Sequence, residues 1–522
     1  MVITGARIYT LDERRPIASA LAVKDGRIVY VGDDAGVITA ISTHHIHAHG
    51  ATIVPGLIDA HGHMQALGTA LETFDLRDVK SVAEVAAIVK EEAARRRPGE
   101  WIRGRGWDQT NWGARFPSAA DLDAAAPANP VCLGRVDGHA IWVNRQALAL
   151  AGITAQTPDP AGGRILRAAT GEPSGVLIDK AMALVERSIP APSAAEIRRR
   201  IARAARECAR FGLTSVHDAG VTAGDLDAYR DLIAHGELPV RVYAMIGGAG
   251  DLWQRVLERG PEIGDRLTVR AIKLIADGAL GSRGAALLEP YSDDAGNTGL
   301  LMLTRDQIAQ VAKEAKAHGF QVATHAIGDR ANRTVLGAYG TALGGANDLR
   351  FRIEHAQVVA PADFDLFRKF SIIASVQATH ATSDMRWAEA RLGPERVKGA
   401  YAWRRFLGLG VAVANGSDFP VESPNPLAGF YAAITRQNRN GEPVAGWFPE
   451  QRMTREEALR SWTQGGAFAA FEEGSKGSLA VGKLADFVVL SADIMRVPPR
   501  EILNARVTMT VVGGEVVYSE TR

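Results

Sequence analysis

The middle of the chain alternates between segments with apolar residues at helical spacing and short segments that are apolar throughout. Ser193, with Glu196 three residues later, forms a capping box before the periodic segment IRRRIARAARECARF, and Gly212 ends that segment before LTSVHDAG. The same order recurs from Thr304 to Gly319 before FQVATHAIGD, and again in YAWRRFLGLG before VAVANGSD. Helices that alternate with short apolar strands predict a parallel sheet that is buried on both faces.

Eight segments have this strand pattern, and eight is the number that closes a (β/α)8 barrel. They are residues 53–61, 214–218, 239–246, 269–277, 321–326, 351–356, 372–379 and 411–418. Residues 71–192 are left over and contain a capped helical segment of their own, from Ser81 to Arg97. We therefore predict an α/β protein built on a TIM barrel, with a large insertion after the first barrel strand.

The two ends of the chain share a different pattern, rich in β-branched residues and in turn signals. Asp25-Gly26 separates two strand-like segments, as is typical of a hairpin, and Gly513-Gly514 marks a tight turn near the other end. We expect residues 1–54 and 474–522 to form one small β-rich domain, and residues 55–473 to form the barrel domain.

Composition and charge narrow the classes of function. The 522 residues include Lys+Arg 60 and Asp+Glu 59, a net charge of +1 without a basic run, which does not favour binding to nucleic acid or to an anionic membrane. No apolar run reaches the ~18 residues that a membrane span needs, and the first residues do not resemble a signal peptide. Cys132 and Cys208 are too few for a disulfide scaffold. These features predict a soluble cytoplasmic protein with a small-molecule substrate, and a homodimer is the commonest assembly of such proteins.

Residues able to bind metal or transfer protons lie at the ends of the predicted strands. They are His61 and His63 in the first, Lys273 in the fourth, His325 in the fifth, His355 in the sixth and Asp418 in the eighth. Barrel active sites form at the C-terminal ends of the strands, so these side chains can converge. A lysine in an apolar strand needs an acidic partner or must lose its charge, whereas Asp418 taken alone could simply cap a helix.

Nine motifs, spread over nearly the whole chain, carry a family resemblance. They are PGLIDAHGHM (55–64), GWDQTNW (106–112), RVDGHAIWVN (135–144), TSVHDAG (214–220), IKLIADGALGSRGA (272–285), THAIGDRA (324–331), RIEHA (352–356), GSDFPVE (416–422) and KGSLAVGKLADFVVL (476–490). With these motifs the chain resembles the amidohydrolase superfamily, in its branch of N-substituted formamide deformylase-like and YtcJ-like metal-dependent hydrolases. The resemblance implies a metal-dependent (β/α)8 barrel with a β-sandwich domain formed by both termini.

The resemblance also implies a centre of two divalent metal ions, for which zinc suits the nitrogen and oxygen donors best. The implied ligands are His61 and His63 for one ion, His325 and His355 for the other, Lys273 between them, and Asp418. Lys273 matches the lysine that superfamily members carboxylate with carbon dioxide, which gives an anion that bridges both ions. Asp418 matches the aspartate that ligates one ion and acts as the general base toward the bridging water.

Substrate-side residues are expected in the insertion and in the loops after the strands. The insertion holds four of the nine tryptophans, which could form either an aromatic pocket or a small core of its own. The substrate-binding candidates are Trp107, Asp108, Asp137 and His380; His139 and His217 are further catalytic candidates that could stabilise an oxyanion. His380 follows Gln377-Ala378, where YtcJ-like sequences often have proline after the glutamine.

The leading hypothesis is a hydrolase that uses metal-activated water to cleave an amide C–N bond, of N-substituted formamides or N-acyl compounds. A mononuclear deaminase of the same superfamily is one alternative, although such enzymes lack the bridging lysine that Lys273 matches. A non-catalytic scaffold is another, although each implied ligand position is filled. Among the histidines at 44, 45, 47 and 49, alternation along a strand could place His45, His47 and His49 on one face as a metal site, but no family motif includes them, and we expect surface residues.

Overall fold

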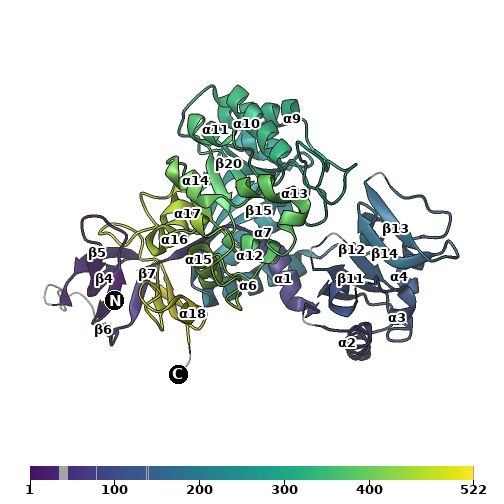
Figure 1. Cartoon of the computed structure of the whole chain (residues 1–522). Coiled ribbons are helices and arrows are strands. Elements are labelled where there is room, and N and C mark those ends of the chain that lie inside the picture. Colours follow the sequence, from purple (N-terminus) through teal and green to yellow (C-terminus); the bar gives the residue numbers. More distant parts are fainter. Residues whose placement is uncertain are drawn as a thin grey trace. The chain divides into compact units, whose positions relative to one another are not determined.

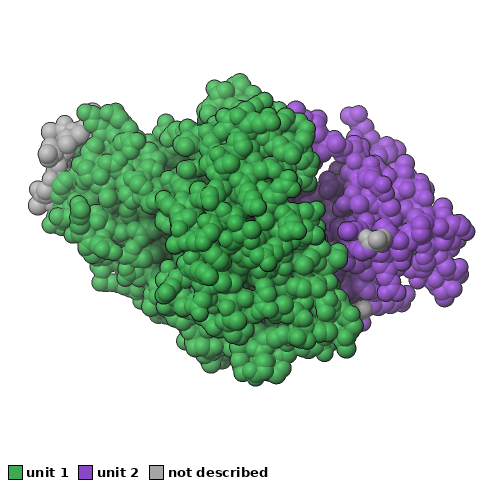
Figure 2. Space-filling model, turned by 90° about the horizontal axis from the view of Figure 1, so that it is seen from above, with its two compact units in different colours: residues 1–65, 201–522 green, residues 66–200 purple. Residues whose placement is uncertain are grey.

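The computed structural model describes residues 1–34, 45–77, 79–113, 115–136, 138, 140–160 and 162–520. They form two compact units, unit 1 with residues 1–65 and 201–522, and unit 2 with residues 66–200 (Figure 2). Within these ranges no helix combines the length and the apolar character that crossing a membrane requires.

Unit 1 is built around a sheet whose strands follow the order β22-β21-β20-β19-β18-β16-β15-β8, each parallel to its neighbours. The strands are β8 Leu57–Gly62, β15 Leu213–Val221, β16 Arg241–Gly247, β18 Leu267–Ile275, β19 Gln321–Ala326, β20 Arg352–His355, β21 Ile373–Val376 and β22 Val413–Asn415; β17 Glu262–Ile263 pairs antiparallel with β18. Hydrogen bonds from Asp418 N to His61 O (2.7 Å) and from His63 N to Phe419 O (2.9 Å) join the two end strands. The predicted α/β barrel is confirmed.

The first predicted strand is in fact two strands. Residues Thr52–Pro55 form β7, which pairs with β2 and β23 in a sheet of the chain termini, and the barrel strand β8 begins only at Leu57. Gly56 lies between them, where a Cβ atom would come within 2.2 Å of Thr214 Oγ1. Glycine is therefore needed at the point where the chain passes from one sheet into the other.

Helices connect the barrel strands, and the predicted caps begin two of them. Ser193 and Glu196 exchange hydrogen bonds before α6 Ala194–Arg210, and Thr304 and Gln307 form a capping box before α9 Arg305–Ala317. The others in unit 1 are α7 Ala223–Ala234, α8 Leu252–Arg259, α10 Asp329–Leu343, α11 Phe364–Lys369, α12 Ala378–Asp384, α13 Ala388–Arg396, α14 Trp403–Gly408, α15 Pro426–Thr435, α16 Arg455–Ser461, α17 Gln464–Ala469 and α18 Pro499–Ile502, with 3-10 turns η4 Val397–Gly399 and η5 Pro449–Gln451.

Unit 1 has two further sheets: one of N-terminal strands alone, in the order β5-β4-β1-β6, and one that combines strands from both ends of the chain, in the order β25-β24-β23-β7-β2-β3. Their strands are β1 Val2–Thr4, β2 Arg7–Tyr9, β3 Ile17–Ala18, β4 Ala20–Lys24, β5 Arg27–Gly32, β6 His45–His47, β23 Phe487–Leu490, β24 Val507–Val512 and β25 Glu515–Ser519. The N- and C-termini accordingly lie at the same end of unit 1 (Figure 1). The hairpin predicted at Asp25-Gly26 joins β4 to β5, and both turn residues have positive φ, 50° and 75°.

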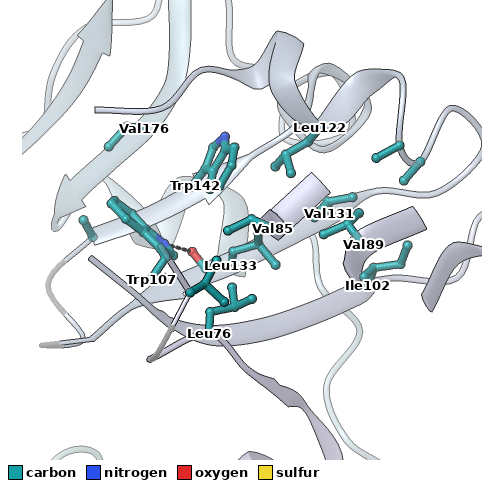
Figure 3. Close-up of a cluster of buried hydrophobic side chains, with 14 residues drawn as sticks. Leu76, Val85, Val89, Ile102, Trp107, Leu122, Val131, Leu133, Trp142 and Val176 are labelled. Atoms are coloured by element: carbon teal, nitrogen blue, oxygen red, sulfur yellow. Dashed lines mark hydrogen bonds between the residues drawn. The ribbon is translucent and has the colours of Figure 1, made fainter. Parts of the chain in front are cut away.

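Unit 2 has its own sheet, in the order β13-β14-β12-β11-β10-β9. Its elements are α1 Met64–Glu72, which leads in from unit 1, β9 Phe74–Asp75, α2 Val82–Ala94, β10 Ile102–Trp107, η3 Gln109–Trp112, α3 Ala119–Asp123, β11 Val131–Arg135, β12 Ala140–Val143, α4 Arg145–Leu150, β13 Gly163–Arg167, β14 Pro173–Asp179 and α5 Met182–Glu186. Trp107 and Trp142 pack edge to face in its apolar core, and Trp107 Nε1 donates to Leu133 O at 2.8 Å (Figure 3). The tryptophans therefore build a core within unit 2.

Candidate metal centre

The six implied ligands all lie at or just beyond the C-terminal ends of barrel strands. His61 is on β8 with His63 just after it, Lys273 is on β18, His325 is on β19, His355 ends β20, and Asp418 follows β22. Three of them form a group that could hold a metal ion, since ligand atoms of His61, His355 and Asp418 all lie within 4.8 Å of one another. The described residues contain one such group, and it forms where the catalytic sites of barrel enzymes form.

Asp418 is the meeting point of the histidines. Its Oδ1 lies 3.1 Å from His63 Nε2 and 3.7 Å from His61 Nε2, and its Oδ2 lies 3.7 Å from His380 Nε2. The backbone at Asp418 has φ 58°, and that at His355 has φ 71°. A non-glycine residue in this left-handed region is strained, and such strain is concentrated at functional sites.

Three of the histidines are oriented by an oxygen atom at Nδ1. His61 Nδ1 bonds to Glu354 Oε2, His63 Nδ1 to Ala219 O at 2.8 Å, and His355 Nδ1 to Gln377 Oε1 at 2.7 Å. Each oxygen is an acceptor, so each ring carries a proton on Nδ1. The Nε2 lone pairs of His61 and His355 are then available to bind a metal ion, which is the arrangement that metal-ligating histidines generally have. His63 Nε2 instead donates to Asp418 Oδ1 at 3.1 Å and must release that proton to become a ligand.

The charges of the centre also suit a divalent cation. Burial, together with the charge of Lys273, lowers the pKa of His61 to about 4 and that of His325 to about 3, so both imidazoles are neutral near pH 7. Burial would raise the pKa of Asp418, but the hydrogen bond with His63 and the charges around it hold that pKa well below its usual range. Neutral imidazoles and an ionised carboxylate are the protonation states that bind metal.

Lys273 is buried beside these groups, with its Nζ 3.1 Å from His61 Nε2. Burial lowers the pKa of the amine to about 8, although the charges of Glu354 and Asp418 act in the opposite direction. A lysine in this setting has a substantial neutral fraction near physiological pH, and a neutral amine can react with carbon dioxide.

The sequence did not single out Asp277, which the fold brings to His325. Asp277 Oδ1 lies 3.5 Å from His325 Nε2 and accepts a hydrogen bond from Ile327 N, while Oδ2 accepts from Gly328 N and Ala286 N. It is fully buried and fixes the chain beyond β18 and β19. The available sequence signal was an acid four residues after Lys273 in the segment IKLIADG, whose other residues are apolar or glycine.

Two more charged residues of the site were missed, Arg352 and Glu354 on β20. Both side chains are fully buried and form an ion pair, and Glu354 Oε2 also bonds to His61 Nδ1. Charged residues at alternate positions of the apolar segment FRIEHA were the sequence signal, because period-2 alternation places them on one face of the strand.

The substrate-side candidates fall in different places. His380 lies at the centre, stacked on His355 with ring centroids 5.9 Å apart, and His217 is buried in the barrel, where its Nδ1 accepts from Arg352. Trp107 is fully buried in the core of unit 2, and Asp108 accepts from Thr110 N and pairs with Arg135. Asp137 and His139 lie outside the described residues. The roles of all six residues in catalysis or binding stay predictions.

The second histidine cluster lies on the edge strand β6 and just after it. His44 is outside the described residues, while His45, His47 and His49 are exposed, with the ring centroids of His47 and His49 4.5 Å apart. Unlike His61, His355 and Asp418, these three histidines do not bring their ligand atoms within 4.8 Å of one another.

Comparison with known proteins agrees with this fold. A model of the amidohydrolase family matches residues 45–518. The chain is 36% identical to Protein LONG AFTER FAR-RED 3 of Arabidopsis thaliana (99% of this chain, 91% of the relative) and 32% identical to the putative amidohydrolase YtcJ of Bacillus subtilis (99% of each). It is 28% identical to the N-substituted formamide deformylase of Arthrobacter pascens (100% and 98%).

One solved structure is also similar to this chain over nearly its whole length. The crystal structure of an uncharacterized metal-dependent hydrolase from Pyrococcus furiosus superposes with a TM-score of 0.79 at 28% identity, over 95% of this chain and 99% of that one. With the family match over residues 45–518, these likenesses show that the chain belongs to the amidohydrolase family.

Proposed function

We propose that this protein is a metal-dependent hydrolase that cleaves amide C–N bonds, with N-substituted formamides or N-acyl compounds as substrates. The observation that carries the proposal is the histidine cluster at Asp418: Nε2 of His63 and of His61 lie 3.1 and 3.7 Å from Asp418 Oδ1, and Nδ1 of His61, His63 and His355 is held by an oxygen. The named activity of the Arthrobacter pascens relative supports the choice of substrate class.

The donor set fits two divalent ions, which we propose to be zinc, held by His61, His63, His325, His355, Asp418 and carboxylated Lys273. Bound there, the ions would lower the pKa of a water molecule and polarise the amide carbonyl. The Lys273 ammonium would first lose one proton; the neutral amine would then attack carbon dioxide, so that one N–C bond forms, one C=O π bond opens and a second proton is released. The residue thereby passes from a buried cation to an anion, which removes the cost of burying an unpaired ammonium.

Asp418 is the proposed general base. Its carboxylate lies among three imidazoles and remains ionised, so it can accept a proton from the attacking water and deliver it to the leaving nitrogen as the C–N bond breaks. The products are a carboxylic acid and an amine. His380, 3.7 Å from Asp418 Oδ2, would contact the substrate beside the reacting carbonyl.

The test is metal analysis of the purified protein together with hydrolysis assays on a panel of formamides, N-acyl amino acids, lactams and esters. We expect two metal equivalents per chain and turnover of formamides or N-acyl compounds. Lys273→Ala should lose most of the metal and activity, with partial rescue by short carboxylic acids. Lys476→Ala is the matched control, because Lys476 is also buried in unit 1 but pairs with Glu472. Metal-loaded protein that hydrolyses no amide of the panel would refute the substrate class.

A further inference from the structure

A buried network of charged residues contacts His61 of the proposed centre. Arg352 pairs with Glu354 through Nε to Oε1 and through Nη2 to Oε2, and Glu354 Oε2 also bonds to His61 Nδ1. Ser375 Oγ donates to the same oxygen at 2.7 Å. Arg352, Glu354 and His61 all have 0% relative exposure, so water does not compete for these contacts.

The geometry fixes the direction of every hydrogen bond around Glu354. A guanidinium can only donate, and the hydroxyl of Ser375 donates to Oε2, so both carboxylate oxygens act as acceptors. Glu354 therefore has no place for a proton of its own, and His61 Nδ1 must donate to it. The lone pair of His61 is left on Nε2, which lies 3.1 Å from Lys273 Nζ and 3.7 Å from Asp418 Oδ1.

Glu354 differs from the acceptors of the other two histidines in being charged. His63 donates to a backbone carbonyl and His355 to the amide oxygen of Gln377, both of which are neutral. Hydrogen bonds to an ionised acceptor are roughly twice as strong as neutral ones. A carboxylate at Nδ1 also makes the imidazole a more basic metal ligand. His61 should thus be the strongest imidazole donor of the three.

Arg352 also connects Glu354 to the surrounding barrel strands. Its Nη2 donates to Ala60 O on β8 and to Ser375 Oγ on β21, and its Nη1 lies 2.9 Å from His217 Nδ1 on β15. Since the guanidinium has no acceptor, His217 Nδ1 must accept, and the proton of that ring is on Nε2. One side chain of β20 therefore contacts three other barrel strands and restrains the carboxylate.

We propose that Glu354, held in place by Arg352, is a positioning residue that sets the metal affinity of the centre through His61. This inference rests on the proposed metal-dependent function and assigns no contact between Glu354 and the substrate. The competing explanation is an ion pair that only stabilises the barrel. A buried ion pair contributes little net stability in many proteins, so stability alone is a weak reason for this arrangement. The two explanations differ in what they predict for metal binding.

The main test is the metal affinity of Glu354→Gln. Glutamine has the same shape but one acceptor oxygen; if that oxygen takes the place of Oε2, its NH2 group faces Arg352 Nε and the charge at His61 is lost. Metal titration of the apoenzyme, in competition with a chelator, should show binding ~10–100-fold weaker than wild type, the usual effect of losing such an outer partner.

Asp486→Asn provides a matched control within unit 1. Asp486 accepts from Arg241 Nε at 2.8 Å and from Nη2 at 3.0 Å, so it is also a buried carboxylate with a bidentate arginine. It stands just before β23, and Arg241 is the first residue of β16, whereas the proposed ligands lie at the C-terminal ends of the barrel strands. We expect this variant to lose thermal stability and to keep the wild-type metal affinity. Equal losses of metal affinity in the two variants would show a general effect of destabilisation and would overturn the proposal.

A second readout does not require metal. In the apoenzyme, the Nδ1 proton of His61 should give a strongly downfield proton NMR resonance that is absent in His61→Ala and shifted upfield in Glu354→Gln. If Glu354→Gln does not fold, Glu354→Asp serves instead. The shorter aspartate keeps a carboxylate beside Arg352 but holds it farther from His61 Nδ1. Wild-type affinity and an unmoved resonance in a folded Glu354 variant would refute the inference. Wild-type protein that binds no metal would instead refute the proposed function.

Discussion

Asp277 offers a direct test of how the chain around the centre is held, because its two oxygens accept three backbone hydrogen bonds. Oδ1 accepts from Ile327 N at 3.0 Å, and Oδ2 accepts from Gly328 N at 2.8 Å and from Ala286 N at 2.9 Å. Asp277→Asn keeps the shape of the side chain but leaves one acceptor oxygen. The amide nitrogen must then face at least one backbone N–H group.

The size of the effect follows from this geometry. The asparagine oxygen is best placed at the Oδ2 position, where two N–H groups converge, and Ile327 N then faces an NH2 group. Leaving a buried donor unsatisfied costs ~1–3 kcal/mol, and about 1.4 kcal/mol changes an equilibrium tenfold. The local opening that exposes Ile327 N should therefore become ~5–150-fold more frequent.

Hydrogen exchange followed by mass spectrometry measures this opening peptide by peptide. The measurement therefore remains valid even if the two units of the chain unfold separately. We expect faster exchange in peptides that contain Ile327. The control is Asp225→Asn, because Thr222 N and Oγ1 both donate to Oδ2 at the start of α7, so an asparagine oxygen placed there keeps both bonds and exchange should stay as in wild type. Wild-type exchange at Ile327 in Asp277→Asn would refute the assigned role of the carboxylate.

Three further predictions follow from other contacts. Asp418→Asn should retain most of the metal yet lower kcat by ~10²–10⁴, the usual range for a general base, and near-normal turnover of the metal-loaded variant would assign the proton transfer to another group. Trp107→Ala should destabilise unit 2 by ~3–5 kcal/mol, seen as a lower-temperature unfolding transition with unchanged metal content, because its side chain is fully buried in an apolar core. The hydrogen bond with Arg404 lowers the pKa of Glu457 to about 2, so its stabilising charge is present above the ordinary value of 4.5 and is lost as pH falls toward 2. Glu457→Gln should therefore melt below wild type at pH 7, and the difference should vanish near pH 2; a difference independent of pH would contradict this.

The sequence by itself determined the order of elements in the barrel. Each of the eight predicted strand segments overlaps a barrel strand, and the capping residues Ser193 and Thr304 stand directly before α6 and α9. These features are local: side-chain periodicity and cap chemistry depend on residues a few positions apart. Strand ends also indicated where Asp418 and the histidines would gather, because the carboxyl ends of barrel strands meet at one face.

The tertiary structure alone decided which side chains meet. His61 and Glu354 bond across a separation of 293 residues, and Asp277 reaches Gly328 across 51. No local pattern encodes such pairs, because they arise from the register of strands closed into a barrel. The same holds for Gly56 between β7 and β8, where the nearby side chain of Thr214 leaves no room for a Cβ atom. It also holds for Trp107, because from the sequence an aromatic side chain fits a pocket or a core equally well. Packing against residues distant in the sequence made Trp107 part of a core.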